Sequence, residues 1–145
     1  MKISTKGRYA LRVMIDLSQF TNNEYISLKE ISERQEISLK YLESIIGMLC
    51  RAGFVLSLRG KCGGYKLARK PGEYTIGSIL KLTEGSLAPV ACLEGDINQC
   101  SRAINCITLP MWQKLDKIID DYLESVTIED LLKQQNEFRG NDYII

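Results

Sequence analysis

The sequence predicts a mostly α-helical fold: a winged helix-turn-helix with a β-hairpin wing, followed by a long C-terminal helix. Three observations predict it. Apolar residues recur at helical spacing, two short helices are joined by a tight turn, and a basic, glycine-rich hairpin follows them. The 145 residues are 45% hydrophobic and 26% charged, which is an ordinary globular balance, so we expect a domain with its own core.

Capping residues place the three helices of the N-terminal half. Ser27 and Glu30 form a capping box, in which the serine accepts a backbone N–H and the glutamate reaches back. Ser38 caps the following helix, and Gly53 ends it. Together with the apolar stripe of the first segment, these signals predict helices at residues 6–20, 28–35 and 39–52.

A turn with three glycines and two cations, residues 59–64, separates two apolar runs. This pattern predicts a hairpin whose strands span residues 54–58 and 65–68. A helix-turn-helix followed by such a basic hairpin is the sequence form of a winged helix.

Beyond the hairpin the pattern is helix, long loop, helix. The loop is longer than compact domains normally contain without a function. Pro110 suits the first turn of the helix that follows, which carries a strong apolar stripe. The expected helices are 76–83, 110–124 and a final short one at 128–135, and the tail is polar up to Tyr143-Ile144-Ile145. We therefore expect a DNA-binding domain at residues 1–85, a cysteine-containing loop at 86–109, and a C-terminal part at 110–145.

The composition excludes several function classes. The chain has no histidine, which removes Ser-His-Asp and Cys-His nucleophiles and every histidine-containing metal site. No glycine-rich loop has the context of a nucleotide-binding loop, so no enzymatic activity is expected. No apolar run is long enough to cross a membrane, and residues 1–16 are charged throughout. We therefore expect neither a membrane span nor a signal peptide, and a cytoplasmic protein.

The net charge of +1 hides an asymmetry between the two halves. Residues 1–70 hold 13 Lys and Arg against 6 Asp and Glu, whereas residues 71–145 hold 6 against 12. A basic half beside an acidic half predicts a nucleic-acid-binding face and a partner or assembly segment.

In a helix-turn-helix the start of the second helix enters the major groove. Here that start presents Ser38, Lys40, Tyr41 and Glu43. Lys40 and Tyr41 can reach phosphates or guanine acceptors, and Glu43 can accept a hydrogen bond from a cytosine amine. The alternative for Glu43 is an ion pair with Lys40 on the same helix.

The wing and the start of the chain supply further candidate contacts. Arg59 is placed to enter a narrow minor groove, and Lys61 lies in the same turn. Small hydroxyls and cations at a helix start suit phosphate binding. The candidates there are Lys2, Ser4, Thr5, Lys6 and Arg8. The alternatives are a solvated loop cation and a solvated helix end.

Five cysteines are present, and three of them, Cys92, Cys100 and Cys106, fall in the long loop. Thiolates are soft ligands that suit iron–sulfur clusters, zinc or copper(I). Three of them on one loop can bind one side of a cluster and leave one coordination position to another group. The alternative is three buried or incidental thiols, and the roles of Cys50 and Cys62 stay open.

The segments MKISTKGRYALRVMIDL, ISERQEISLKYLESII and LRGKCGGYKLARKP closely resemble the Rrf-type winged helix-turn-helix transcriptional regulators of bacteria, in particular their iron–sulfur cluster regulators of the IscR and NsrR group. The motifs KGRYA, SLKYLE and RGKCGGY occur in the family's order over nearly the whole chain. The resemblance implies a homodimer joined by helix 110–124 and a double-stranded DNA operator of two-fold symmetry. It implies the following DNA contacts: Ser38, Lys40, Tyr41, Glu43 and Arg59.

The resemblance also implies that Cys92, Cys100 and Cys106 bind an iron–sulfur cluster, with [2Fe-2S] favoured over [4Fe-4S]. The first spacing, seven residues, is longer than in IscR and NsrR, and Leu109 stands where an IscR-like chain has histidine. Arg8 is basic where some relatives have an acidic ligand. The fourth ligand therefore stays open between a partner residue, a backbone group, water, a small thiol and four loop side chains, namely Glu94, Asp96, Asn98 and Asn105.

These features favour a cluster-sensing repressor of cluster-assembly or related sulfur and redox genes. The alternative is a regulator of the same fold without a cluster, which responds to thiol oxidation or to a partner protein. A small electron-transfer or cluster-carrier protein would leave the basic helix-turn-helix half without a role.

Overall fold

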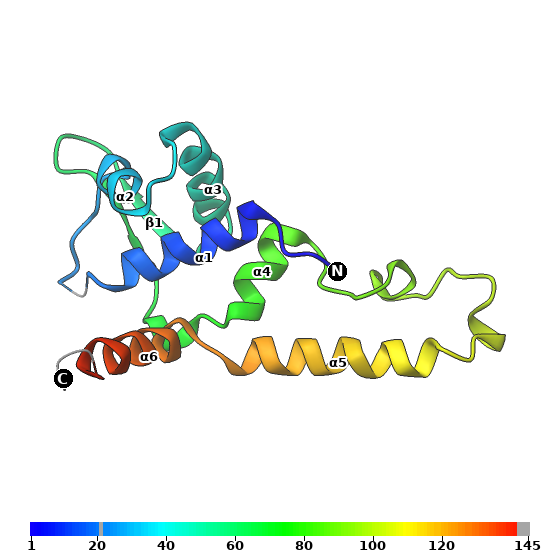
Figure 1. Cartoon of the computed structure of the whole chain (residues 1–145). Helices are drawn as coiled ribbons and strands as arrows, with labels where there is room; N and C mark the ends of the chain where they lie inside the picture. The colour runs from blue at the N-terminus through cyan, green and yellow to red at the C-terminus, as the bar shows by residue number, and fades with distance from the viewer. Residues whose placement is uncertain (21, 142–145) are drawn as a thin grey trace.

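The computed structural model describes residues 1–20 and 22–141 and confirms the predicted fold class (Figure 1). In chain order the elements are α1 (Thr5–Ser18), α2 (Leu28–Gln35), α3 (Leu39–Arg51), β1 (Val55–Leu58), β2 (Gly64–Leu67), the 3-10 turn η1 (Pro71–Glu73), α4 (Ile76–Glu84), the 3-10 turns η2 (Ala91–Leu93) and η3 (Ala103–Asn105), α5 (Leu109–Ser125) and α6 (Ile128–Asn141). None of the described helices is long and apolar enough to cross a membrane.

Helix α1 is the central helix of the domain, because α2, α3, α4, α6 and β2 all pack against it. Its buried apolar face carries Ala10, Val13, Met14 and Leu17, which are three and four residues apart and so form one stripe. This stripe meets buried residues of every neighbouring helix, and together they make a single core.

A buried carboxylate joins α1 to α2. Asp16 lies in the buried face of α1 with only 1% of its side chain exposed. Arg34 of α2 donates two hydrogen bonds to it, from Nε to Oδ2 at 3.0 Å and from Nη2 to Oδ1 at 2.7 Å. Gln35 Nε2 donates a third, at 2.8 Å. A buried charge is costly unless it is paired and hydrogen-bonded in this way, so these contacts fix α2 on α1.

The turn between α2 and α3 follows the predicted pattern. Glu36 ends α2 with a left-handed backbone conformation, at φ 54°. Ser38 then caps α3, and its Oγ accepts a hydrogen bond from the N–H of Tyr41 at 3.3 Å. The apolar face of α3 is buried (Leu42, Ile45, Ile46 and Leu49), so the opposite face is exposed.

The wing is the antiparallel pair β1–β2, in which Val55 lies opposite Leu67. Two backbone hydrogen bonds of 2.8 Å each join Tyr65 of β2 to Ile26, just before α2. Gly64 makes this approach possible. Its φ is +155°, and a Cβ there would lie 2.3 Å from the carbonyl oxygen of Ile26. The wing is therefore fixed to the helix-turn-helix by backbone contact.

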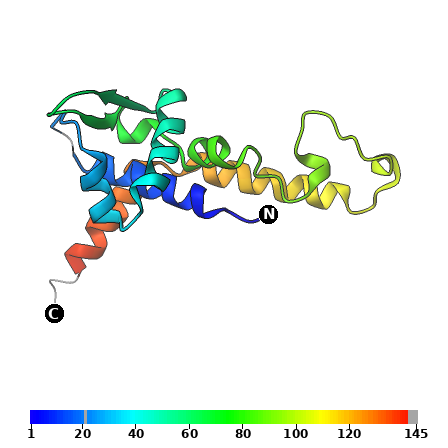
Figure 2. The same ribbon diagram turned by 90° about the horizontal axis from the view of Figure 1, so that it is seen from above.

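The segment after α4 leads away from the domain, α5 runs back toward the domain from the far end, and α6 follows it there (Figures 1 and 2). The junction between them is bonded to the start of α4: the N–H of Ile76 donates to the carbonyl of Val126 at 2.8 Å, and the N–H of Ile128 donates to the carbonyl of Tyr74 at 3.0 Å. Ile128 is fully buried, whereas α5 has no buried residue.

Helix α6 is longer than predicted, because it continues to Asn141 instead of ending near residue 135. The residues that follow 135 include no proline, and Gly140 is their first glycine, so no stop signal lies where the sequence pattern weakens. The irregular loop also contains the short turns η2 and η3. The predicted apolar end, Tyr143-Ile144-Ile145, lies outside the described residues.

Replacing Arg34 should destabilise the fold more than its exposure suggests. In Arg34→Met the Asp16 carboxylate keeps only Gln35 as a side-chain donor, and we expect the free energy of unfolding to fall by about 3 kcal/mol, measured by urea denaturation. Lys29→Met, at an exposed position of the same helix, should change it by less than about 0.5 kcal/mol. Equal losses in the two variants would contradict the role given to this pair.

Candidate nucleic-acid interface and thiol loop

The recognition helix α3 and the wing meet at a hollow lined by Glu43 and Arg59, two of the expected DNA contacts, and by Cys50. Glu43 is exposed, and within the described residues it forms no ion pair with Lys40, so the intrahelical alternative is not realised. Its carboxylate is free to accept a hydrogen bond from a base amine. Burial raises the pKa of the Cys50 thiol above its ordinary value, which keeps this cysteine neutral.

Tyr41 is oriented by a side chain of α1. Its ring forms a T-shaped pair with the ring of Tyr9, with centroids 5.6 Å apart and an interplanar angle of 87°. The guanidinium of Arg12 lies 5.2 Å from the centroid of Tyr9 on the same stack. Aromatic pairs of this geometry restrict the ring, so Tyr41 presents its exposed edge from a fixed position.

The start of α1 already uses its hydroxyls. The Oγ of Ser4 caps the helix by accepting a hydrogen bond from the N–H of Gly7 at 3.1 Å. Arg8 donates from Nη2 to Thr5 Oγ1 at 3.3 Å. A phosphate at this helix start would therefore meet hydroxyls that have protein partners and cations that remain free.

The cations expected to face DNA form no ion pair within the described residues; they are Lys2, Lys6, Arg8, Lys40, Arg59 and Lys61. The lysines of the acidic half behave differently, since three of them pair with carboxylates of α5 and α6: Lys81 with Asp120 and Glu124, Lys117 with Asp121, and Lys133 with Glu129. The positive charge of the first half is thus available to an external polyanion.

The thiol loop, residues 86–108, runs beside the projecting half of α5 and turns back at its far end (Figure 2). Its start and the side of α5 line one hollow together, with Leu87 and Asp96 on the loop and Ile119 and Asp120 on the helix. No three Cys, Asp or Glu side chains of the described residues lie close enough together to hold a metal ion. The loop as it stands therefore does not gather Cys92, Cys100 and Cys106.

Two of the thiols nevertheless share a hollow with one of the four candidate oxygen donors. Cys92, Cys100 and Glu94 line it together. Asp96 lies in the separate hollow beside α5, and Asn98 already accepts a hydrogen bond from the N–H of Cys100 at 2.9 Å. Asn105 belongs to η3. Of the four candidate donors, Glu94 is the one that lines this hollow with the two thiols, although the three side chains do not lie close enough together to hold a metal ion.

Cys106 lies just before α5 and does not line that hollow. Its Sγ is 3.4 Å from Thr108 Oγ1, and this hydrogen bond lowers the pKa of the Cys106 thiol below its ordinary value. A lowered pKa increases the thiolate fraction, and the thiolate is the form that binds metals. Leu109 starts the helix in the next turn. Three thiols, one with lowered pKa, form a donor set whose chemistry fits an iron–sulfur cluster.

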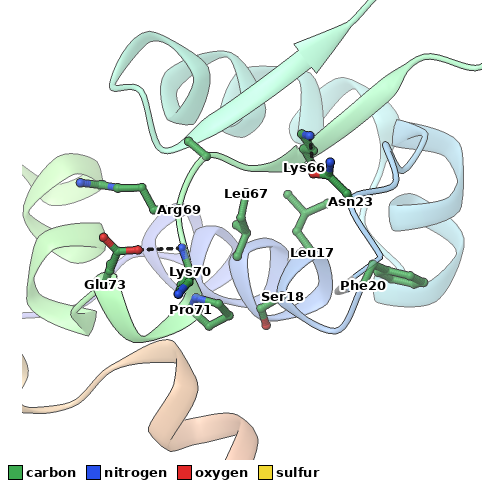
Figure 3. A pocket seen from close by; sticks show the side chains of 11 residues that line it. Leu17, Ser18, Phe20, Asn23, Lys66, Leu67, Arg69, Lys70, Pro71 and Glu73 are labelled. Carbon is green, nitrogen blue, oxygen red and sulfur yellow. Dashed lines mark hydrogen bonds between the residues drawn. The ribbon is translucent and has the colours of Figure 1, made fainter.

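A further groove lies between the end of α1, β2 and η1 (Figure 3). Leu17 and Leu67 line it, and Lys66 at its edge donates from Nζ to Asn23 Oδ1 at 2.6 Å. None of the expected DNA contacts or loop thiols lines this groove, so it has no part in either candidate site.

The sequence pattern did not show which residues support the site. From α1, Tyr9 contacts Tyr41 and Arg12 contacts Gln35. No local sequence motif indicates contacts between residues so far apart in the chain. The spacing of the predicted first helix could have shown only that these two side chains leave α1 on the same side.

Known proteins resemble this chain over nearly its whole length. A family model described as Rrf2, an iron-dependent transcriptional regulator, matches residues 3–134. A protein of Neisseria meningitidis described as an HTH-type transcriptional regulator is 41% identical over 97% of this chain and 94% of its own. The HTH-type transcriptional regulator IscR of Vibrio campbellii is 35% identical over 98% and 83%.

Two solved structures have the same fold. CymR, the global cysteine regulator of B. subtilis, superposes with a TM-score of 0.75, at 35% identity over 92% of this chain and 98% of its own. T. potens IscR superposes with a TM-score of 0.74, at 39% identity over 94% and 90%.

Proposed function

This chain belongs to the Rrf2 family of transcriptional regulators, and on that premise we propose that it is a sequence-specific repressor whose homodimer senses an iron–sulfur cluster. It is a DNA-binding regulator and not an enzyme. The observation that carries the proposal is that one chain joins two features. The first is a basic helix-turn-helix and wing whose DNA-facing cations form no ion pair within the described residues, and the second is a loop with three thiols.

DNA recognition falls to the start of α3 and to the wing. Lys40, Tyr41 and Glu43 lie on the exposed face of α3, which is the face that enters a major groove in this motif. Arg59 lines the same hollow as Glu43, so the wing lies next to the recognition helix. When α3 enters the major groove, the wing can therefore reach along the DNA backbone into the adjacent minor groove. The unpaired cations at the start of α1 supply phosphate contacts.

A second copy of the chain covers α5. Met111, Leu115, Ile118 and Tyr122 are exposed and spaced by four, three and four residues, and Tyr122 is 66% exposed. Such a stripe on a projecting helix is the seam of a two-helix contact. A two-fold dimer pairs the stripe with itself and presents two recognition helices to a symmetric operator.

Cys92, Cys100 and Cys106 would hold the cluster, with Glu94 as the oxygen donor best placed for the fourth position. When bound, such a cluster would be sensitive to oxidation, to nitric oxide and to iron shortage, each of which removes it. Ile104 and Ile107 flank Cys106 and are 96% and 95% exposed, which is unusual for isoleucine. This exposure supports a loop that becomes ordered when another surface covers these side chains. Because the loop lies against α5, its order would set the spacing of the two recognition helices.

The cluster-free regulator remains a second candidate, because the chain is similar to CymR as well as to IscR. The identities are 35% to CymR of B. subtilis and 36% to the oxidized form of CymR of Staphylococcus aureus. In that case the loop thiols would respond to oxidation or to a partner protein. The target genes would be those of cluster assembly or related sulfur and redox functions in the first case, and those of cysteine metabolism in the second.

Arg59→Ala should weaken binding to an operator selected from genomic fragments by about tenfold and lower the slope of log affinity against log salt by about 1. The reason is the loss of one groove cation. Lys133→Ala, on α6, should change neither quantity. If the salt dependence of Arg59→Ala were the same as that of the wild type, the wing would not be part of the DNA interface.

Ile118→Glu should convert the protein from dimer to monomer in sedimentation experiments, since it places a charge in the apolar seam of α5. Gln113→Glu adds the same charge to the same helix outside the stripe and should leave the dimer intact. A dimer that survives Ile118→Glu would place the interface elsewhere.

Anaerobically purified protein should be brown, with about two irons per chain for the smaller cluster. Alanine at Cys92, Cys100 or Cys106 should remove the colour and change operator affinity, whereas Cys62→Ser should keep the iron. Glu94→Gln should shift the visible spectrum and speed cluster loss, and Asp96→Asn should do neither. A colourless protein that cannot be reconstituted would favour the cluster-free regulator and leave DNA binding intact.

A further inference from the structure

The start of α1 is bonded to the end of α4 through one carboxylate. Glu84, the last residue of α4, accepts two hydrogen bonds from Ser4, from Oγ at 2.5 Å and from the N–H at 3.2 Å, both at Oε1. The same Ser4 Oγ accepts from the N–H of Gly7. The hydroxyl therefore links the first turn of α1 to Glu84 as donor and acceptor at once.

The first turn of α1 is shaped to admit this carboxylate. A Cβ on Gly7 would lie 2.3 Å from Glu84 Oε1 and 3.1 Å from Thr83 Oγ1, so a larger residue would displace Glu84. A negative charge is also favourable at a helix N-terminus, where the unpaired N–H groups point outward. Within the described residues Glu84 forms no ion pair that would hold it elsewhere.

Glu84 is also the last helical residue before the thiol loop. Gly85 follows with a left-handed φ of +78°, and the loop begins at the next residue. Residues 1–3 and Glu84 line one hollow together with loop residues 86–91 and Glu94. The chain end that leads into α1 and the chain segment that leads into the thiol loop thus share one contact surface.

We propose that Glu84 is a positioning residue, which holds the DNA-facing start of α1 and couples it to the thiol loop. The proposal rests on the proposed function, since it assumes that the cations of this helix start meet phosphate. When the loop changes its order, Glu84 moves with it, and the turn that carries Lys6 and Arg8 gains or loses its anchor. Operator affinity and loop order are then linked through one carboxylate.

Three variants separate this role from a general loss of charge or stability. Glu84→Ala removes the acceptor, Glu84→Gln keeps an acceptor oxygen for Ser4, and Glu137→Gln makes the same charge change at an exposed position of α6. Without DNA, Glu84→Ala should speed hydrogen exchange at the amides of Gly7 and Arg8 by about tenfold, because Ser4 loses both of its hydrogen bonds to this charged group. Glu84→Gln and Glu137→Gln should stay close to the wild type.

With operator DNA, Glu84→Ala should bind about five- to tenfold more weakly than the wild type, and Glu84→Gln should restore binding. DNA should slow amide exchange at residues 85–94 in the wild type and in Glu84→Gln, and this protection should vanish in Glu84→Ala. Weaker binding with protection retained would show anchoring without coupling and overturn the proposal, as would unchanged binding. A wild-type protein that binds no operator would instead refute the proposed function, while the exchange data without DNA would still report on the anchor.

Discussion

The arrangement of the DNA-binding half depends on one buried charge. Asp16 lies in the apolar face of α1, where a lone carboxylate would be unstable, and it is satisfied only when α2 brings Arg34 and Gln35 to it. Gln35 in turn accepts a hydrogen bond from Arg12 Nε at 3.1 Å. Burying an ion pair adds little net stability compared with apolar packing, but its three directional hydrogen bonds constrain where α2 can lie on α1. Since only three residues separate α2 from α3, that placement also sets the direction of the recognition helix.

The same helix, α1, contacts both of the regions that are proposed to be coupled, namely the DNA-binding helices and the segment that leads into the thiol loop. Near its C-terminal end it holds α2 through Asp16, and at its N-terminal end it holds the exit of α4 through Ser4. Tyr9, between these ends, packs on Tyr41 of α3. A helix of 14 residues is stiff over its length of about 21 Å, so a displacement at one end is transmitted as a rigid tilt. Under the proposed coupling, the central position of α1 makes it the element through which the loop would act on α3.

Elements with strong local signals could be predicted from the sequence, and contacts across the fold could not. The capping box at Ser27 and the cap at Ser38 placed α2 and α3 within a residue of their observed bounds. The predicted end of α6 was wrong, because the amphipathic pattern weakens before any residue that would end the helix. The partners of Asp16 and Ser4 lie 18 and 80 residues away, and no periodicity encodes such pairings. The three loop thiols were predicted to act together, but spacing could not show that the loop as described does not gather them.

The absence of histidine gives the loop its particular chemistry. At the position where a histidine would follow the third cysteine, Leu109 begins α5, and its apolar side chain cannot coordinate iron. With no nitrogen ligand of that kind in the chain, a fourth protein donor must be an oxygen, a sulfur or a backbone group. Glu94 is a hard ligand beside soft thiolates, and it also lines the hollow shared by the loop and the chain start. If Glu94 were to help hold a cluster, it would do so within the same small region as Glu84. The chemistry of the loop and the anchoring of α1 are therefore adjacent in the structure, which is the condition that a direct coupling between them requires.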